Sequence, residues 1–253
     1  MSEQLSNQGG LPTGTEIVGR VFNTPLTIWK FSWIPITQLI VWIIFTRNAS
    51  KRNPKKPAFY WSTEGFFKMA AMLGSEWCHN LAHAFAANKV GKPMDQMRIQ
   101  MGMPRCIYNK LNDEEVTPRQ HIMRSLGGPI FNLVMLPIAA ILRLFSKPNS
   151  IANETAKTAY QTNLFLSTTS LLPIPGIDGG PLLKWSLVEK GYKIKDADQV
   201  VQETNGPLAV LLGLFSSWSF INKKILAGIF SLMLGIISLS VFTGWLKEED
   251  VSI

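Results

Sequence analysis

Long runs without any charged residue alternate with short charged segments along this chain. Two apolar stretches, 31–46 and 69–88, are interrupted by few polar groups. Four further runs contain no Asp, Glu, Lys or Arg at all, at residues 125–142, 158–177, 206–222 and 225–246. A membrane-spanning helix needs about 20 predominantly apolar residues, whereas helices of a soluble protein usually keep one polar face. The pattern therefore predicts helices that cross a membrane.

We expect an all-α membrane protein with about six transmembrane helices in a single domain. A polar N-terminal tail, 1–25, and a C-terminal tail, 247–253, flank a transmembrane domain at 26–246. The N-terminal tail lacks an apolar segment with a small-residue cleavage site, so we expect no cleaved signal peptide. The predicted spans are residues 26–46, 66–89, 123–145, 158–183, 206–222 and 225–246.

Composition and charge agree with this assignment. The 253 residues are 46% hydrophobic and 17% charged, with a net charge of +8. The charges lie between the apolar runs, where the headgroups of the lipid bilayer account for an excess of Lys and Arg. No nucleic-acid-binding motif accompanies them, so we expect no nucleic-acid partner. Lys and Arg are almost balanced between the two sides of the predicted spans, so the positive-inside rule gives no orientation.

The second predicted span carries an unusual set of polar side chains. Glu76, His79, Asn80 and His83 fall on one face of a helix, because residues three and four apart are neighbours across a turn. Polar groups within a span are costly and are candidates for function. Two histidines four residues apart can bind one zinc ion, although packing histidines show the same spacing.

A third candidate ligand follows the fourth charge-free run. Pro173 and Pro175 break the helix there and present Asp178 from irregular backbone. Such backbone is tolerated at membrane depth only where it lines a cavity or is buried in protein. Two histidines and one carboxylate are the ligand set of a catalytic zinc site with an open position. The residues therefore predict Zn²⁺ bound by His79, His83 and Asp178.

Three motifs, taken in order, resemble the site-2 protease family of intramembrane zinc metalloproteases. They are HxxxH (His79, His83), GPxxN (Gly128, Pro129, Asn132) and PxPxxDG (Pro173, Pro175, Asp178, Gly179). The resemblance covers residues 66–190. It implies a core of three helices, zinc held by the two histidines and the aspartate, and cleavage of membrane-spanning substrates within the bilayer. It also implies a short membrane-associated hairpin between residues 91 and 120, after the HxxxH helix.

One departure from the family concerns the chemistry. The family motif reads HExxH, and Asn80 occupies the position of its glutamate. That glutamate is the general base, which accepts a proton from the attacking water. An amide has a similar shape but cannot accept this proton. Because general acid–base catalysis is worth about 10²- to 10⁴-fold in rate, we expect proteolysis to be absent or strongly impaired.

A second departure concerns the substrate. The resemblance implies that Asn132 and the residue at position 170 help to position the substrate. Position 170 is usually Asn in the family. This chain has Ser170 there. A serine keeps one donor and an acceptor but reaches less far than an asparagine.

Three explanations for Asn80 remain open. The protein can be a natural pseudoprotease, or a proteolytic protein that was altered at this one position. Glu76 can act as a substitute base, although it lies one turn before Asn80, about 6 Å along the helix axis. The metal can also be absent. A transporter is a further class, but the chain lacks the inverted repeats that would favour it.

The expected function is therefore a site-2 protease-like zinc metalloprotease scaffold that acts on membrane-spanning substrates. The alternative is a non-catalytic pseudoprotease that binds transmembrane segments or partner proteins and regulates them. In either case we expect an integral, multi-pass protein of a bacterial cell membrane, with the lipid bilayer and a membrane-spanning substrate or client as its partners.

Overall fold

The structure, a computed structural model, describes residues 14–113 and 115–246. Helices dominate this part of the chain, as predicted. Residues 1–13 of the predicted N-terminal tail and the whole predicted C-terminal tail, 247–253, lie outside the described residues. The helices are α1 (Ile36–Arg52), α2 (Ala58–Lys89), α3 (Pro118–Phe145), α4 (Ile151–Thr169), α5 (Gly179–Glu189), α6 (Ile194–Ile221) and α7 (Ile225–Phe242).

A four-stranded sheet corrects the all-α prediction. Its order is β1-β2-β3-β4, with an antiparallel pair at each edge and a parallel pair, β2 with β3, in the middle. β1 and the start of β2 occupy residues predicted as a polar tail. Strands this short show only a weak alternating pattern, and β2 is stabilised by a partner far along the chain. The strands are β1 (Thr15–Val21), β2 (Thr24–Trp29), β3 (Gln96–Gln100) and β4 (Met103–Ile107).

Two-residue turns close both hairpins of the sheet. Phe22 and Asn23 have φ angles of 46° and 62°, and Met101 and Gly102 have φ angles of 51° and 79°. Positive φ at both central residues is the type I′ turn, whose twist matches that of the flanking strands. The hairpin predicted between residues 91 and 120 is therefore present as β3 and β4. Its association with a membrane stays a prediction.

Prolines set the starts of the first two helices. Pro35 directly precedes α1, and Pro57 directly precedes α2. Proline suits these positions because the first N–H groups of a helix have no intrahelical partner in any case. The first predicted span, 26–46, begins too early, since most of β2 and the turn after it occupy its first residues.

The fourth predicted span, 158–183, is divided into two helices. α4 and α5 are separated by a loop at 170–178. Pro173 and Pro175 lie in this loop, and proline both lacks an N–H donor and disfavours helical backbone in the residue before it. The break leaves Asp178 at the N-cap of α5, pointing back toward the other helices.

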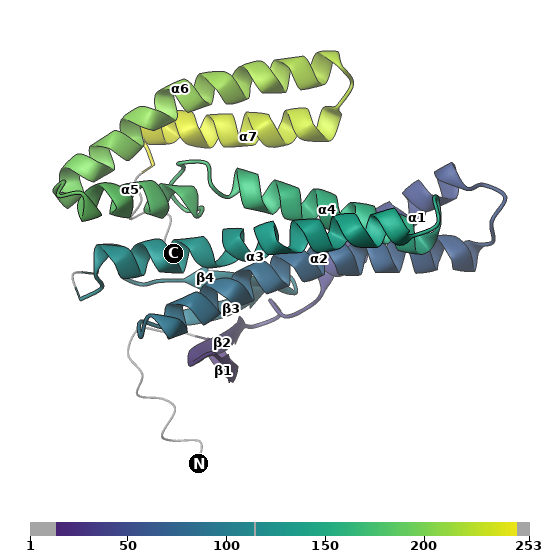
Figure 1. The fold of residues 1–253 in the computed structure, drawn as a ribbon, viewed down its shortest axis with the longest axis horizontal. Coiled ribbons are helices and arrows are strands. Elements are labelled where there is room, and N and C mark those ends of the chain that lie inside the picture. Colours follow the sequence, from purple (N-terminus) through teal and green to yellow (C-terminus); the bar gives the residue numbers. More distant parts are fainter. Residues whose placement is uncertain (1–13, 114, 247–253) are drawn as a thin grey trace.

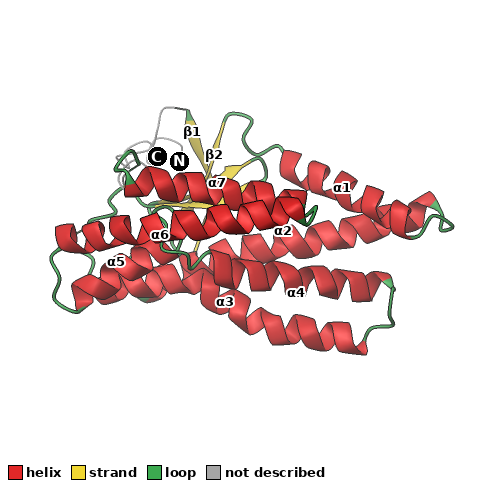
Figure 2. Cartoon of the chain, turned by 90° about the horizontal axis from the view of Figure 1, so that it is seen from above, coloured by secondary structure: helices red, strands yellow, loops and turns green. Residues whose placement is uncertain are grey.

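Helix α2 lies at the centre of the arrangement. It contacts α1, α3, α4 and β4. The sheet and the α6–α7 hairpin lie on opposite sides of the layer that contains α2 and α3 (Figure 1), and the strands gather in one place beside the helices (Figure 2). Helix α5 contacts both α3 and α6, so it joins the hairpin to the central helices. α6 begins before the predicted span at 206–222. Its first turns are polar, so the pattern of charge-free runs did not include them.

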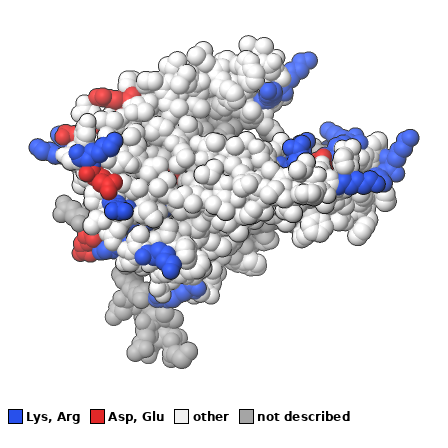
Figure 3. All heavy atoms as spheres, in the orientation of Figure 1, with Lys and Arg blue, Asp and Glu red and all other residues white. Residues whose placement is uncertain are grey.

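Two helices of the described residues, α3 and α7, are long and apolar enough to cross a membrane by length and composition. Large apolar side chains are also exposed on other helices, among them Ile43 of α1 and Leu214 of α6. On the face drawn in Figure 3, charged side chains gather toward the two ends and leave the middle uncharged. The prediction of six spans is not confirmed by these observations and stays a prediction.

A cluster of buried charges joins α1, α2 and α4 at one end of the helices. Arg52 forms ion pairs with both Glu64 and Glu154. Lys68 Nζ lies 3.5 Å from Glu154 Oε2. The side chain of Glu64 is fully buried, and its cost of burial is offset only while a cation faces it.

We predict that Arg52→Ala lowers the free energy of unfolding by about 3 kcal/mol, because it leaves two buried carboxylates with too little compensating charge. This loss lies at the lower end of the range for breaking a buried ion pair, because the Arg52 side chain is itself 34% exposed. Unfolding of the purified protein in detergent micelles measures it. Lys51→Ala, which removes an exposed cation beside it, should cost less than about 0.5 kcal/mol. Equal losses in the two variants would contradict a role for the cluster.

Candidate metal centre

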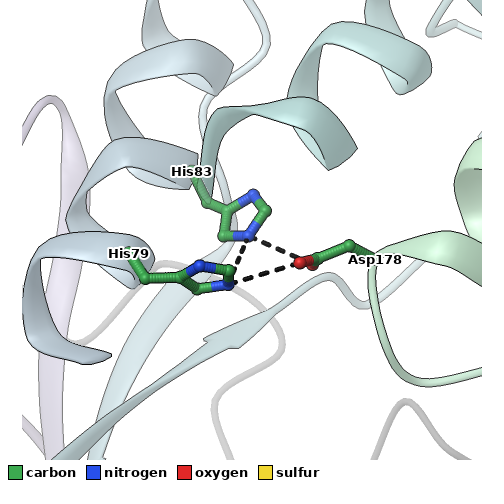
Figure 4. Close-up of side chains that lie close together, drawn as sticks. All are labelled: His79, His83 and Asp178. Atoms are coloured by element: carbon green, nitrogen blue, oxygen red, sulfur yellow. Dashed lines mark hydrogen bonds and ion pairs between the residues drawn. The ribbon is translucent and has the colours of Figure 1, made fainter. Parts of the chain in front are cut away.

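Two histidines and one aspartate from two segments of the fold converge on a single point. His79 and His83 are one turn apart on α2, and Asp178 faces them from the start of α5 (Figure 4). The two Nε2 atoms are 3.1 Å apart. The Asp178 carboxylate oxygens lie 3.3 Å from Nε2 of His79 and 3.1 Å from Nε2 of His83. The structure therefore brings together the three predicted ligands.

The hydrogen bonds of the two rings show that this point suits a cation. Nδ1 of His79 faces Asn132 Oδ1, and Nδ1 of His83 lies 2.7 Å from the carbonyl oxygen of Arg124. An oxygen acceptor holds the ring proton on Nδ1, so each Nε2 presents a lone pair. Asp178 Oδ2 is then buried without a hydrogen-bond donor. Two lone pairs and a carboxylate repel one another unless a positive ion lies among them, and these donors suit zinc.

Glycines allow the neighbouring segments to approach the histidines. A methyl group on Gly128 of α3 would overlap His83 Nε2 and the His79 ring, and one on Gly127 would lie 2.6 Å from the Ala82 carbonyl oxygen. A methyl group on Gly179 would overlap the carbonyl oxygens of the loop before α5. Glycine is therefore required wherever α3 and α5 meet the metal centre.

Two buried side-chain amides lie on the Nδ1 side of the His79 ring. Asn132 is fully buried, and its Nδ2 donates to Asn163 Oδ1 at 2.7 Å while its Oδ1 faces His79. Asn163 Nδ2 in turn donates to Ser75 Oγ at 3.0 Å. Both polar atoms of Asn132 thus have partners within the protein, and its role in positioning substrate stays a prediction. The sequence marks Asn163 only as a polar residue in an apolar run.

Asn80 lies in the pocket beside the metal centre but is engaged by its neighbours. Its Nδ2 is 3.0 Å from the carbonyl oxygen of Glu76 and 3.3 Å from Glu76 Oε1. The thiol of Cys106 in β4 donates to Asn80 Oδ1 at 3.2 Å. The Glu76 carboxylate is therefore directed at the Asn80 amide, and no carboxylate occupies the position of the family base.

Ser170 lies at the end of α4 and lines the same pocket. Its hydroxyl donates to the Leu166 carbonyl oxygen at 2.5 Å, and its own carbonyl oxygen accepts from the Gly179 backbone N–H at 2.7 Å. The side chain thus caps its own helix. To position a substrate as predicted, the Ser170 hydroxyl would have to give up its hydrogen bond to Leu166 and donate to the substrate instead.

A pocket of about 380 Å³ opens onto the metal centre. Its lining includes polar groups, among them Tyr108 and Arg124, and apolar side chains of α4 and α7, among them Phe165 and Leu234. This volume is typical of a ligand site. Sequence reasoning did not identify Tyr108 or Arg124, because neither belongs to a motif and the fold alone brings them together.

The fold and this site define a helical protein with a buried two-histidine, one-aspartate centre of the kind that binds catalytic zinc. No family model matches the chain. Over 83 residues it is 32% identical to a protein of Methanocaldococcus jannaschii that is named a zinc metalloprotease; the match covers 33% of this chain and 42% of that protein. The chain thus aligns with less than half the length of this relative.

The fold matches the solved structure of the site-2 protease from Methanocaldococcus jannaschii. The TM-score is 0.53 at 15% sequence identity, and the match covers 90% of this chain and 95% of that one. The sequence match and the fold together support a relationship between this chain and the site-2 protease family, the family that its motifs indicate.

We predict that Gly128→Ala abolishes metal binding, because the added methyl group would displace both histidine rings from the point where their lone pairs meet. Zinc retained per chain after dialysis measures the loss. Gly74→Ala is the matched control, since Gly74 is on α2 and has open space where the methyl group would lie. Retention of zinc by Gly128→Ala would show that the ion does not lie between these rings.

Asn132→Ala should weaken zinc binding by about 10- to 100-fold, the usual effect of removing a group that orients a metal-binding histidine. Competition with a chromophoric chelator gives the affinity. The exposed Asn222 at the end of α6 provides the control variant Asn222→Ala, which should bind zinc as the unaltered protein does. If both variants bind equally well, the amides behind His79 play no part in the site.

Proposed function

We propose that this chain is a site-2 protease-like zinc metalloprotease scaffold that acts on membrane-spanning polypeptides, with proteolysis absent or strongly impaired. The observation that carries the proposal is the convergence of two histidine lone pairs and the Asp178 carboxylate on one buried point. The sequence relationship to a protein named a zinc metalloprotease agrees with zinc as the ion.

His79, His83 and Asp178 would hold the zinc ion, which when bound would supply a Lewis acid for polarising a peptide carbonyl. Asn132 and the Arg124 carbonyl keep the two rings in the required tautomer. The pocket beside these ligands receives a short stretch of polypeptide. A helix is about 10 Å across with its side chains, so a helical substrate would have to be locally extended to enter a cavity of about 380 Å³.

The proton transfer is the step for which this chain lacks a residue. Asn80 cannot accept a proton, and its amide hydrogens are directed at Glu76. Glu76 as a substitute base would first have to leave this contact. Hydrolysis without a general base should be slower by about 10²- to 10⁴-fold.

The second candidate function is a pseudoprotease that binds transmembrane segments or partner proteins and regulates them without cutting them. It is favoured by the combination of an open pocket, an intact ligand set and an amide at position 80. We further propose that the protein is a multi-pass membrane protein, because large apolar side chains are exposed on several helices and patches of this kind suit lipid. A bacterial membrane stays a prediction.

We predict about one zinc ion per chain in the unaltered protein and in Asn80→Glu, with cleavage of a synthetic membrane-spanning peptide about 10²- to 10⁴-fold faster in Asn80→Glu. Metal analysis and peptide fragments separated by mass give the two measurements. Asn80→Glu combined with His79→Ala is the control and should neither retain zinc nor cut.

Three outcomes would change the proposal. Zinc near zero in both forms would reject a metal centre. Cleavage by the unaltered protein that disappears in Glu76→Gln would make Glu76 the base and reject the pseudoprotease. Zinc retention without cleavage in Asn80→Glu would favour the binding function over the enzyme scaffold.

A further inference from the structure

A buried cation without a counterion lies in the wall of the pocket. Arg124 of α3 is only 8% exposed, and its guanidinium carbon is 3.8 Å from the centre of the Tyr108 ring. Among the residues that the structure describes, no carboxylate forms an ion pair with it. Buried charges are almost always paired, because an unpaired one loses its hydration without compensation.

Two neighbouring hydrogen-bond donors at this place also lack acceptors. Arg124 Nε and Tyr108 Oη are both buried and have no hydrogen-bond partner within the described part of the chain. Burial raises the pKa of Tyr108 to about 12, so its hydroxyl keeps its proton at neutral pH and acts as a donor. A buried donor left unpaired is costly, so a charge and two donors together indicate a ligand group with negatively charged oxygens.

Arg124 and Tyr108 line the same pocket as His79, His83 and Asp178. The Arg124 carbonyl oxygen accepts from His83 Nδ1, which faces away from the Nε2 atoms. The backbone of Arg124 is thus behind His83, and its side chain lies along the pocket wall toward Tyr108. The acidic groups of the pocket are directed elsewhere, Asp178 toward the point between the two histidine Nε2 atoms and Glu76 toward the Asn80 amide.

We propose that Arg124 and Tyr108 form a carboxylate-binding subsite, which selects polypeptide segments that carry Asp or Glu next to the metal centre. The inference rests on the proposed function, in that the ligand is a polypeptide. A planar guanidinium matches a carboxylate with two parallel hydrogen bonds. An acidic residue inside a membrane segment carries a high free-energy cost. Binding of its carboxylate to this subsite would offset that cost, but only while the segment occupies the pocket.

Binding of three fluorescent peptides to the zinc-loaded protein in detergent micelles tests the subsite. The first has an amidated C-terminus and one central Glu, the second has Gln in its place, and the third is the Gln peptide with a free C-terminal carboxylate. We expect the Glu peptide to bind about tenfold more tightly than the Gln peptide. The preference should disappear in Arg124→Gln and decrease in Tyr108→Phe.

Arg119→Gln is the matched control, because Arg119 is on the same helix but exposed and outside the pocket; it should keep the full preference. Zinc content reports whether each variant retains the metal centre, since the Arg124 carbonyl that contacts His83 is unchanged in Arg124→Gln. If that variant loses zinc, Tyr108→Phe decides the question.

Equal binding of the Glu and Gln peptides, or a preference that survives in both Arg124→Gln and Tyr108→Phe, would overturn the subsite and leave the proposed function intact. Binding of none of the peptides would overturn both. Tight binding of the third peptide that depends on Arg124 would support the subsite with a chain terminus as its occupant.

Discussion

The arrangement at the centre of this protein depends on the mutual repulsion of three electron-rich groups, the Nε2 atoms of His79 and His83 and the Asp178 carboxylate. Both histidines keep their protons on the far side of their rings, so two lone pairs and a carboxylate meet within 3.1 to 3.3 Å. Such an arrangement is stable only with a cation among them or with a compensating proton. The surrounding structure is built to maintain it. α3 approaches through glycine, the α4–α5 loop carries Asp178 inward, and Asn132 fixes one ring.

Three potential metal ligands meet in this site, and an amide, Asn80, lies beside them. Asn80 preserves the shape of the position while its amide pairs with Glu76. The unpaired donors are elsewhere, at Arg124 and Tyr108, and they face the pocket. In the proposed function, recognition would depend on the pocket wall, whereas proton transfer would depend on one side chain of α2.

Polar contacts between helices stabilise a bundle whose outer surface is largely apolar. Arg52 and Lys68 face Glu64 and Glu154 where three helices meet, and Ser238 of α7 donates to Asn205 of α6 at 2.7 Å. A buried polar group is costly unless it is hydrogen-bonded, so such contacts offset the cost of placing these side chains between the helices. These contacts give each helix pair a defined register that apolar packing alone would leave loose.

The hairpin after α2 was expected from the resemblance of the motifs to a known family. The sequence by itself determined the mostly helical class, the HxxxH face of α2 and the proline break that presents Asp178. These are local properties, because helical periodicity, proline breaks and short motifs are encoded within a few residues. Only the tertiary structure decided that residues 15–29 join the sheet, that Asn132 supports His79, and that Arg124 meets Tyr108. Each of these depends on a partner distant in the chain, and no local pattern specifies which distant residue will be the partner.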